Sequence, residues 1–216
     1  MEDSSYWEIE PNEIVIRTCE HIKSGNALDL GCGEGRDAAF LTKKGFDVLA
    51  VDSSARGIHK AEQLAKIHKL KIKTRIEDII DLSLNKNFDL ILCNNVLHFL
   101  DFKNVKKVIE KMKKHTKIGG LNVISAFIEN SGRYMTICPE FSNKTISIFS
   151  HAGHEIVYNE MNDKKGFAFL FKENQLKEFY REWDIIHYKE LTTGIEQHDF
   201  TKLRRHGISE IIARIK

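Results

Sequence analysis

Apolar residues along this chain follow the two spacings of strands and helices, in alternation. Four short apolar runs have the length of buried strands and lie at 27–29, 47–51, 88–93 and 121–127. Between and around them, apolar residues recur at three- and four-residue intervals, which predicts amphipathic helices. We expect such helices at 12–23, after a cap at Ser53 or Ser54, at 104–115 and at 176–183. This alternation predicts a largely parallel sheet covered by helices.

Three further segments read as strands. Residues 71–76 alternate apolar and basic side chains, as an edge strand does. Residues 184–190 and 209–215 follow later, and we expect the last of them to pair antiparallel at the sheet edge. Between 128 and 166 the periodicity fails over a length too great for an ordinary connection. We therefore expect one domain over 1–216, with an insertion on the substrate side around 128–166.

The most informative stretch is the turn after the first strand. It reads Asp-Leu-Gly-Cys-Gly-Glu-Gly from Asp29, so Gly31, Gly33 and Gly35 let the backbone approach a ligand and adopt positive φ. Asp52 ends the second strand, where a carboxylate can accept hydrogen bonds from ribose hydroxyls. Together they indicate a nucleoside cofactor. Asp29 and Glu34 flank the turn and would repel a pyrophosphate but favour an amino group and a sulfonium.

These residues resemble the glycine motif of class I S-adenosylmethionine (SAM) methyltransferases. The resemblance implies a Rossmann-like three-layer α/β sandwich, with a seven-stranded, mostly parallel sheet whose last strand is antiparallel. It also implies SAM as cofactor, with Asp78 and the N–H of Ile79 at the adenine. Asn94, after the fourth strand, is expected to line the same pocket, and Ser53 to lie beside Asp52 at the ribose.

The order of segments over most of the chain is similar to that of the bacterial tellurite-resistance methyltransferases, which modify tellurite and selenite. The segments that carry this likeness are GCGEGRDAAFL, FDLILCNNVLHFL, IGGLNVISAF, FLFKENQLKEFYREWDIIHYKE and EIIARIK. By this resemblance the candidates for holding the acceptor are His198, Arg204, Arg205 and His206. The chain departs from the family in having the long segment 137–165, and its arginines align only after a shift.

Composition narrows the partners. The formal net charge is +2 with 30% charged residues spread along the chain, which favours a small-molecule substrate over nucleic acid. We expect no membrane association and a cytoplasmic location, because no apolar run approaches the roughly 20 residues of a membrane span. Four scattered cysteines fit reduced thiols. His151 and His154 have Gly153 between them and no third ligand fixed by spacing, so no metal site is predicted.

Two other functions fit part of the pattern. The chain could be a non-catalytic SAM-binding regulatory module in which the 128–166 insertion closes the substrate face. It could also be a dinucleotide oxidoreductase, which the carboxylates at the turn and the antiparallel last strand disfavour. Among methyltransferases, the acceptor could be a tellurium or selenium oxyanion, a thiol or another small metabolite. His98 could be a general base or a structural side chain.

Overall fold

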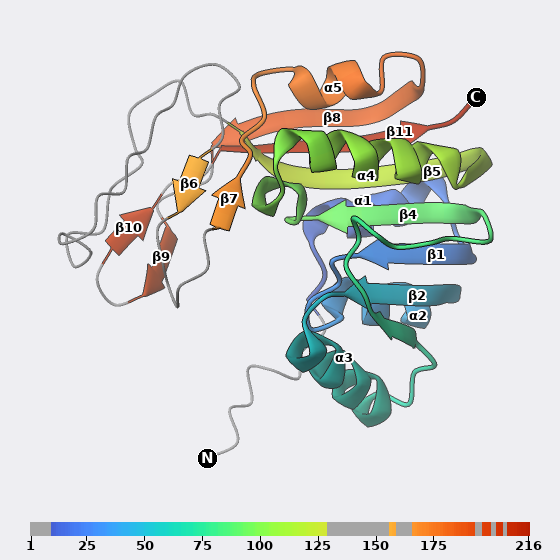
Figure 1. The fold of residues 1–216 in the computed structure, drawn as a ribbon. Helices are drawn as coiled ribbons and strands as arrows, with labels where there is room; N and C mark the ends of the chain where they lie inside the picture. Colours follow the sequence, from blue (N-terminus) through green and yellow to red (C-terminus); the bar gives the residue numbers. More distant parts are fainter. Residues whose placement is uncertain (1–9, 129–155, 159–165, 193–195, 200–201, 205–206) are drawn as a thin grey trace.

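The computed structural model describes residues 10–128, 156–158, 166–192, 196–199, 202–204 and 207–216. Seven strands form one sheet in the order β3-β2-β1-β4-β5-β11-β8 (Figure 1). Their bounds are β1 Gly25–Leu30, β2 Phe46–Asp52, β3 Lys73–Ile76, β4 Phe88–Asn94, β5 Thr116–Ile128, β8 Asp184–Thr192 and β11 Gly207–Arg214. The helices are α1 Glu13–His21, α2 Arg36–Lys43, α3 Ala55–Ile67, α4 Phe102–Lys114 and α5 Gln175–Phe179, with a short 3₁₀ turn, η2, at Leu97–Phe99.

The sheet confirms the predicted fold class. Strands β1 to β5 pair parallel, and the last strand, β11, is antiparallel. The expected place of that last strand was wrong, because β11 pairs with β5 on one side and with β8 on the other, so that β8 forms the edge. Burial explains the difference: Ile211, Ile212 and Ala213 of β11 are fully buried. The residues of β8 from Asp184 to Leu191 are only partly buried or exposed, which suits an edge.

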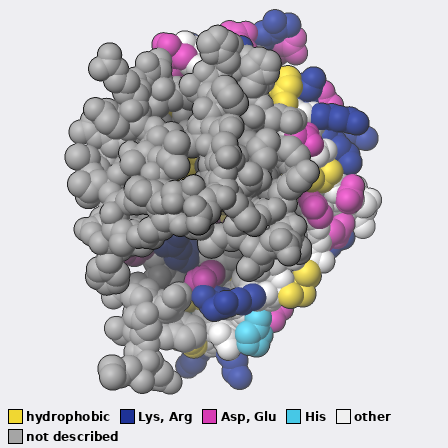
Figure 2. All heavy atoms as spheres, turned by 60° about the vertical axis from the view of Figure 1, so that its left-hand side comes forward, with side chains coloured by type: hydrophobic (Ala, Val, Ile, Leu, Met, Phe, Trp, Pro, Cys, Tyr) yellow, Lys and Arg dark blue, Asp and Glu magenta, His cyan; other side chains and the backbone are white. Residues whose placement is uncertain are grey.

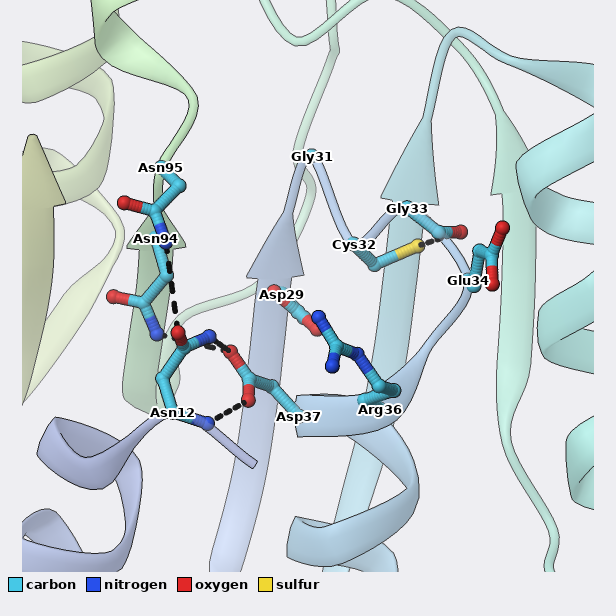
Figure 3. Close-up of a pocket in the computed structure, with 10 residues that line it drawn as sticks. All are labelled: Asn12, Asp29, Gly31, Cys32, Gly33, Glu34, Arg36, Asp37, Asn94 and Asn95. Carbon is cyan, nitrogen blue, oxygen red and sulfur yellow. Dashed lines mark hydrogen bonds between the residues drawn. The ribbon is translucent and has the colours of Figure 1, made fainter. Parts of the chain in front are cut away.

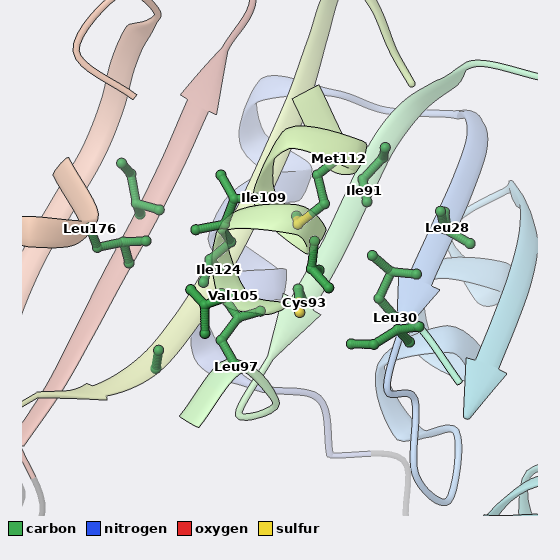
Figure 4. Packing of buried hydrophobic residues seen from close by; sticks show 14 of the residues in the cluster. Leu28, Leu30, Ile91, Cys93, Leu97, Val105, Ile109, Met112, Ile124 and Leu176 are labelled. Atoms are coloured by element: carbon green, nitrogen blue, oxygen red, sulfur yellow. The ribbon is translucent and has the colours of Figure 1, made fainter. Parts of the chain in front are cut away.

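Two apolar layers hold the helices on opposite faces of the sheet. On one face, Ile14 and Val15 of α1 and Leu41 of α2 belong to the same apolar cluster as Leu90 and Leu92 of β4. On the other face, α4 and α5 contribute side chains to a second apolar cluster that includes the neighbouring residues of β4, and Figure 4 shows Ile91 and Cys93 in that layer. Because successive side chains of a strand point to opposite faces, a strand covered on both faces needs a continuous apolar run.

Of the two predicted caps of α3, Ser54 is the one that the structure shows, since its hydroxyl accepts the N–H of Gly57 at 3.0 Å. Other boundaries differ from the sequence-based expectation. The strand predicted over 121–127 begins earlier, because β5 starts at Thr116 and includes Gly119 and Gly120 at a register shift. The helix predicted over 176–183 ends at Phe179, and its continuation is a turn. Each difference concerns hydrogen bonding at an element's end, where apolar spacing says little.

Two antiparallel hairpins lie beyond the sheet edge at which the parallel strands end (Figure 1). One is formed by β6 Ile156–Tyr158 and β7 Gly166–Ala168, and the other by β9 Glu196–Asp199 and β10 Lys202–Arg204. After β7 the chain returns to the sheet, where the N–H of Phe171 donates to the carbonyl of Phe127 at 3.0 Å. Most of the expected insertion lies outside the described residues, so its role stays a prediction.

The described surface carries mixed charge. On the face turned forward in Figure 2, acidic and basic side chains are interspersed among the described residues, as the small net charge leads one to expect. Within the described part of the chain, none of the helices has the length and apolar character needed to cross a bilayer.

Candidate functional site

The glycine turn between β1 and α2 has the backbone that the sequence predicts. Gly31, Gly33 and Gly35 have φ values of 71°, 54° and 81°, in the region that favours glycine. A Cβ on Gly35 would lie 2.6 Å from the Cβ of Ala61, so this glycine allows α2 to pack closely on α3. A Cβ on Gly33 would meet no described atom within 4 Å, so this glycine borders open space.

Asp52, at the end of β2, holds this turn in place. One of its carboxylate oxygens accepts the N–H of Gly33 at 2.8 Å, and the other accepts the N–H of Ser54 at 2.8 Å. A carboxylate has about four acceptor positions, so two hydrogen bonds leave capacity for a ligand's hydroxyls. Asp52 therefore orders the turn and stays available at the carboxyl edge of the sheet.

A pocket of about 530 Å³ opens beside the turn (Figure 3). It lies where β1 and β4 end, the position at which ligands bind in open α/β sheets. Its lining is mostly polar and comprises Asn12, Asp29, Gly31, Cys32, Gly33, Glu34, Arg36, Asp37, Asn94 and Asn95.

Buried acceptors dominate one wall of this pocket. Asp29 is 2% exposed and Asn94 is 9% exposed. Oδ2 of Asp29 and Oδ1 of Asn94 are buried without a hydrogen-bond partner among the residues that the structure describes. A buried acceptor without a donor costs about 1–3 kcal/mol, so this wall suits a ligand that brings N–H groups.

Burial raises the pKa of Asp29 well above its ordinary value, and the nearby carboxylates of Asp37 and Asp52 raise it further. The backbone N–H of Ala38 opposes this shift. Burial and the charges of Asp29 and Asp52 also raise the pKa of the Cys32 thiol, so Cys32 stays protonated and serves as a small wall residue. The wall therefore favours a positively charged ligand group.

The pocket mouth, unlike the acidic wall, carries charged side chains of both signs. Glu34, which the sequence suggests as a second acid at the turn, forms an ion pair with Lys60. Arg36, the first residue of α2, is exposed on the pocket wall and forms no ion pair with another described residue. The pocket thus combines buried acceptors with an exposed cation, the two features that a zwitterionic amino-acid group requires.

These residues fit a cofactor of the SAM type. The buried acceptors of Asp29 and Asn94 that have no partner among the described residues suit an ammonium group, and Arg36 suits a carboxylate. The open space at Gly33 leaves room for the ligand beside the turn. Asp52 offers its remaining acceptor positions to hydroxyl groups at the adjacent strand end.

The structure brings some predicted cofactor residues together and separates others from the pocket. Asp29, Gly31, Gly33 and Asn94 all line it, whereas Gly35 lies behind the turn. The remaining predicted residues, which do not line this pocket, are Asp52, Ser53, Asp78 and Ile79.

The predicted adenine residues follow the neighbouring strand end. The N–H of Glu77 donates to the carbonyl of Asp52 at 3.0 Å, which places the start of the 77–79 segment beside Asp52. Asp78 is exposed, and one of its carboxylate oxygens accepts the N–H of Ile80. The side chain of Ile79 is buried in the core.

Two of the four predicted acceptor-binding residues lie on the second hairpin. His198 belongs to β9 and Arg204 to β10, while Arg205 and His206 lie outside the described residues. His98 is 3% exposed, and its ring stacks on Phe127 with centroids 4.0 Å apart, which supports the structural alternative.

Six pocket residues were not among the predicted site residues: Asn12, Cys32, Glu34, Arg36, Asp37 and Asn95. Cys32 and Glu34 belong to the glycine turn itself. Arg36 and Asp37 directly follow the glycine turn at the start of α2, so their position in the chain could have suggested them. Asn95 adjoins the predicted Asn94. Asn12 carries no local signal, because only folding brings the start of α1 to this pocket.

Comparison with known proteins agrees with this geometry. A family model described as "Tellurite resistance protein TehB" matches residues 5–164 and 155–205. A curated relative from Haemophilus influenzae, named "Probable S-adenosyl-L-methionine-dependent methyltransferase TehB", is 30% identical over 176 residues, covering 82% of this chain and 52% of the relative. The chain thus spans about half the length of the curated TehB relatives it matches.

Solved structures show the same fold. The crystal structure of TehB from Haemophilus influenzae matches with a TM-score of 0.72 and 28% identity, over 94% of this chain and 61% of that one. The 1,6-didemethyltoxoflavin-N1-methyltransferase of Burkholderia thailandensis, solved with S-adenosylhomocysteine, matches with a TM-score of 0.67 at 16% identity, over 100% and 80% of the two chains. The family match covers more than half of the sequence and agrees with the fold and the pocket, so this chain belongs to the tellurite resistance protein TehB family.

Proposed function

We propose that this chain is a SAM-dependent methyltransferase that moves a methyl group to a small soft nucleophile, such as a tellurium or selenium oxyanion or a thiol. Family membership supports the reaction class. The observation that carries the proposal is the pocket at the glycine turn, where buried acceptors and an exposed cation lie at the carboxyl edge of the sheet.

Different residues of the pocket would bind different groups of the cofactor. Asp29 would accept hydrogen bonds from the ammonium group, and Arg36 would pair with the carboxylate. The carboxylates of this wall would also favour the sulfonium charge. A neutral cofactor or a pyrophosphate would gain nothing from this wall.

The adenosine part would lie along the ends of β2 and β3. Asp52 would accept hydrogen bonds from the ribose hydroxyls, with Ser53 beside it. Asp78 and the N–H of Ile79 would meet the adenine ring. The link between Glu77 and Asp52 supports this path, since it holds the two strand ends side by side.

SAM supplies a methyl group that is already activated by its sulfonium. The protein therefore has mainly to bind the acceptor, orient it in line with the methyl group and exclude water, an effect that can reach several kcal/mol. For an oxyanion acceptor, His198, Arg204, Arg205 and His206 would hold the oxygens. For a thiol, His198 or His206 would take the proton.

Titration calorimetry with S-adenosylhomocysteine and SAM tests the cofactor, and methyl-labelled SAM with tellurite, selenite and thiols tests the transfer. We expect saturable binding and labelled methyl products from at least one acceptor. Absence of binding would overturn the proposal. Binding without transfer to any acceptor would favour the regulatory module instead.

A paired variant tests the acceptor site. Arg205→Ala combined with His206→Ala should lower turnover at least tenfold and leave the affinity for S-adenosylhomocysteine within twofold, because the two residues are proposed to meet the acceptor alone. Unchanged turnover would place the acceptor site elsewhere, with the 128–166 segment as the next candidate.

A further inference from the structure

Asp37 is a buried carboxylate beside the pocket whose hydrogen bonds come from two distant parts of the chain. It is 8% exposed and lies in the first turn of α2. Its Oδ1 accepts the backbone N–H of Asn12 at 2.9 Å, and its Oδ2 accepts Nδ2 of Asn12 at 2.7 Å and Nδ2 of Asn94 at 3.1 Å. Figure 3 shows the three side chains grouped at one end of the pocket.

The bonds from Asn12 fix the direction of the Asp37 carboxylate. Asn12 donates to both of its oxygens, so the carboxylate is held on two sides. One of these donors is a backbone N–H just before α1, which cannot turn as a side chain can. Asp37 therefore presents Oδ2 to Asn94 in a fixed orientation.

This orientation decides which half of the Asn94 amide is left for a ligand. A carboxylate oxygen accepts hydrogen bonds, so the NH₂ group of Asn94 must face Asp37. Oδ1 of Asn94 then points away from Asp37 (Figure 3). That oxygen is buried and has no partner among the described residues, although Asn94 lines the pocket.

We propose that Asp37 is a positioning residue for cofactor binding, which holds Nδ2 of Asn94 so that Oδ1 of Asn94 accepts a hydrogen bond from the ammonium group of SAM. The proposal deepens the proposed function and rests on it. Asn94 touches the ligand, and Asp37 acts through Asn94.

The substitution Asp37→Asn separates this role from general packing. The variant has the same shape but one acceptor oxygen in place of two. The backbone N–H of Asn12 keeps that oxygen, so the new NH₂ group faces the side-chain amides. The side-chain amide of Asn94 then has to rotate so that its Oδ1 accepts from this NH₂ group. Its own NH₂ group would then face the ligand's ammonium in place of Oδ1.

Two ligands distinguish the outcomes in calorimetry. S-adenosylhomocysteine carries the ammonium group, and 5′-methylthioadenosine lacks the whole amino-acid part. We expect Asp37→Asn to raise the Kd of the first about tenfold or more, the effect of one hydrogen bond to a charged group, and that of the second less than twofold. Equal weakening of both ligands, or of neither, would overturn the proposal.

Asp89→Asn is the matched control. Asp89 lies in β4, at the strand end remote from the pocket, and its carboxylate accepts the backbone N–H of Asn26 at 2.7 Å and Nζ of Lys117 at 2.8 Å. The control makes the same chemical change and should lower the melting temperature. Its ratio of the two Kd values should equal that of the wild type.

A double-mutant cycle with Asn94→Ala tests the route of the effect. Asn94→Ala alone should weaken S-adenosylhomocysteine about tenfold, and adding Asp37→Asn should weaken it no further. If Asp37→Asn weakened this affinity in the Asn94→Ala background as much as it does in the wild type, the proposal would be overturned. An unchanged affinity of Asn94→Ala would also overturn it. That second measurement tests the proposal even if the Asp37→Asn variant does not fold. A wild-type chain that binds neither S-adenosylhomocysteine nor SAM would instead overturn the proposed function, and this inference with it.

Discussion

Two glycines have a backbone with positive φ, and we expect alanine at one of them, but not at the other, to weaken binding of S-adenosylhomocysteine. Gly33 lies in the pocket turn with φ 54°, and Gly45 lies between α2 and β2 with φ 97°. A Cβ at either position would meet no described atom within 4 Å. Alanine at either site therefore costs only the backbone strain, about 1–2 kcal/mol. For a domain of this size that lowers the melting temperature by roughly 2–8 °C.

The difference between the two variants should appear in the affinity for S-adenosylhomocysteine. The open space beside Gly33 is the pocket, so the added methyl group would occupy room that the cofactor needs. Overpacking costs about 1–3 kcal/mol, which corresponds to a Kd raised roughly 5- to 150-fold. Gly45→Ala should bind as the wild type does.

Gly35→Ala completes the series. Its Cβ would lie 2.6 Å from the Cβ of Ala61 and 3.1 Å from its Cα, so steric overlap adds to the strain. We expect about 2–5 kcal/mol of destabilisation in all, more than for either other glycine. The measurements are chemical denaturation without ligand and calorimetry with S-adenosylhomocysteine. If Gly33→Ala bound this ligand as tightly as Gly45→Ala, the space beside Gly33 would not be the cofactor site.

Two further changes test the energetics of buried polar groups. Burial raises the pKa of Asp29, so the native state holds a proton that the unfolded state loses above about pH 4, and ligand-free stability falls as pH rises through that window. Asp29→Asn should remove this pH-dependent loss of stability, so the free energy of unfolding of the variant relative to the wild type should increase with pH in a series of denaturation measurements. If that difference did not change with pH, the raised pKa of Asp29 would be contradicted. Tyr180→Phe should cost about 1–3 kcal/mol, because the buried Tyr180 hydroxyl accepts Nδ2 of Asn122 at 3.0 Å, while S-adenosylhomocysteine affinity should stay unchanged; an unchanged unfolding free energy would mean that Asn122 finds another partner.

Local patterns in the chain were enough to predict a largely parallel sheet covered by helices, and the glycine turn at its edge. Apolar runs such as 88–93 indicate strands buried on both faces, and the glycine spacing from Gly31 to Gly35 indicates a tight turn at a strand end. Parallel strands joined by helices place their carboxyl ends at one edge, so Asp29 and Asn94 could be expected near each other. These inferences need only residues close in the sequence and the general geometry of a parallel sheet.

Contacts between distant residues decided the rest. The position of β11 between β5 and β8 depends on which strand has the more buried side chains, and apolar spacing within each segment does not compare them. Hydrogen bonds from Asn12 and Asn94 to Asp37 join the start of α1, the start of α2 and the end of β4. Hydrogen bonds of this kind are set by the direction of side chains in the folded protein, so only the tertiary structure could determine which polar atoms face the pocket.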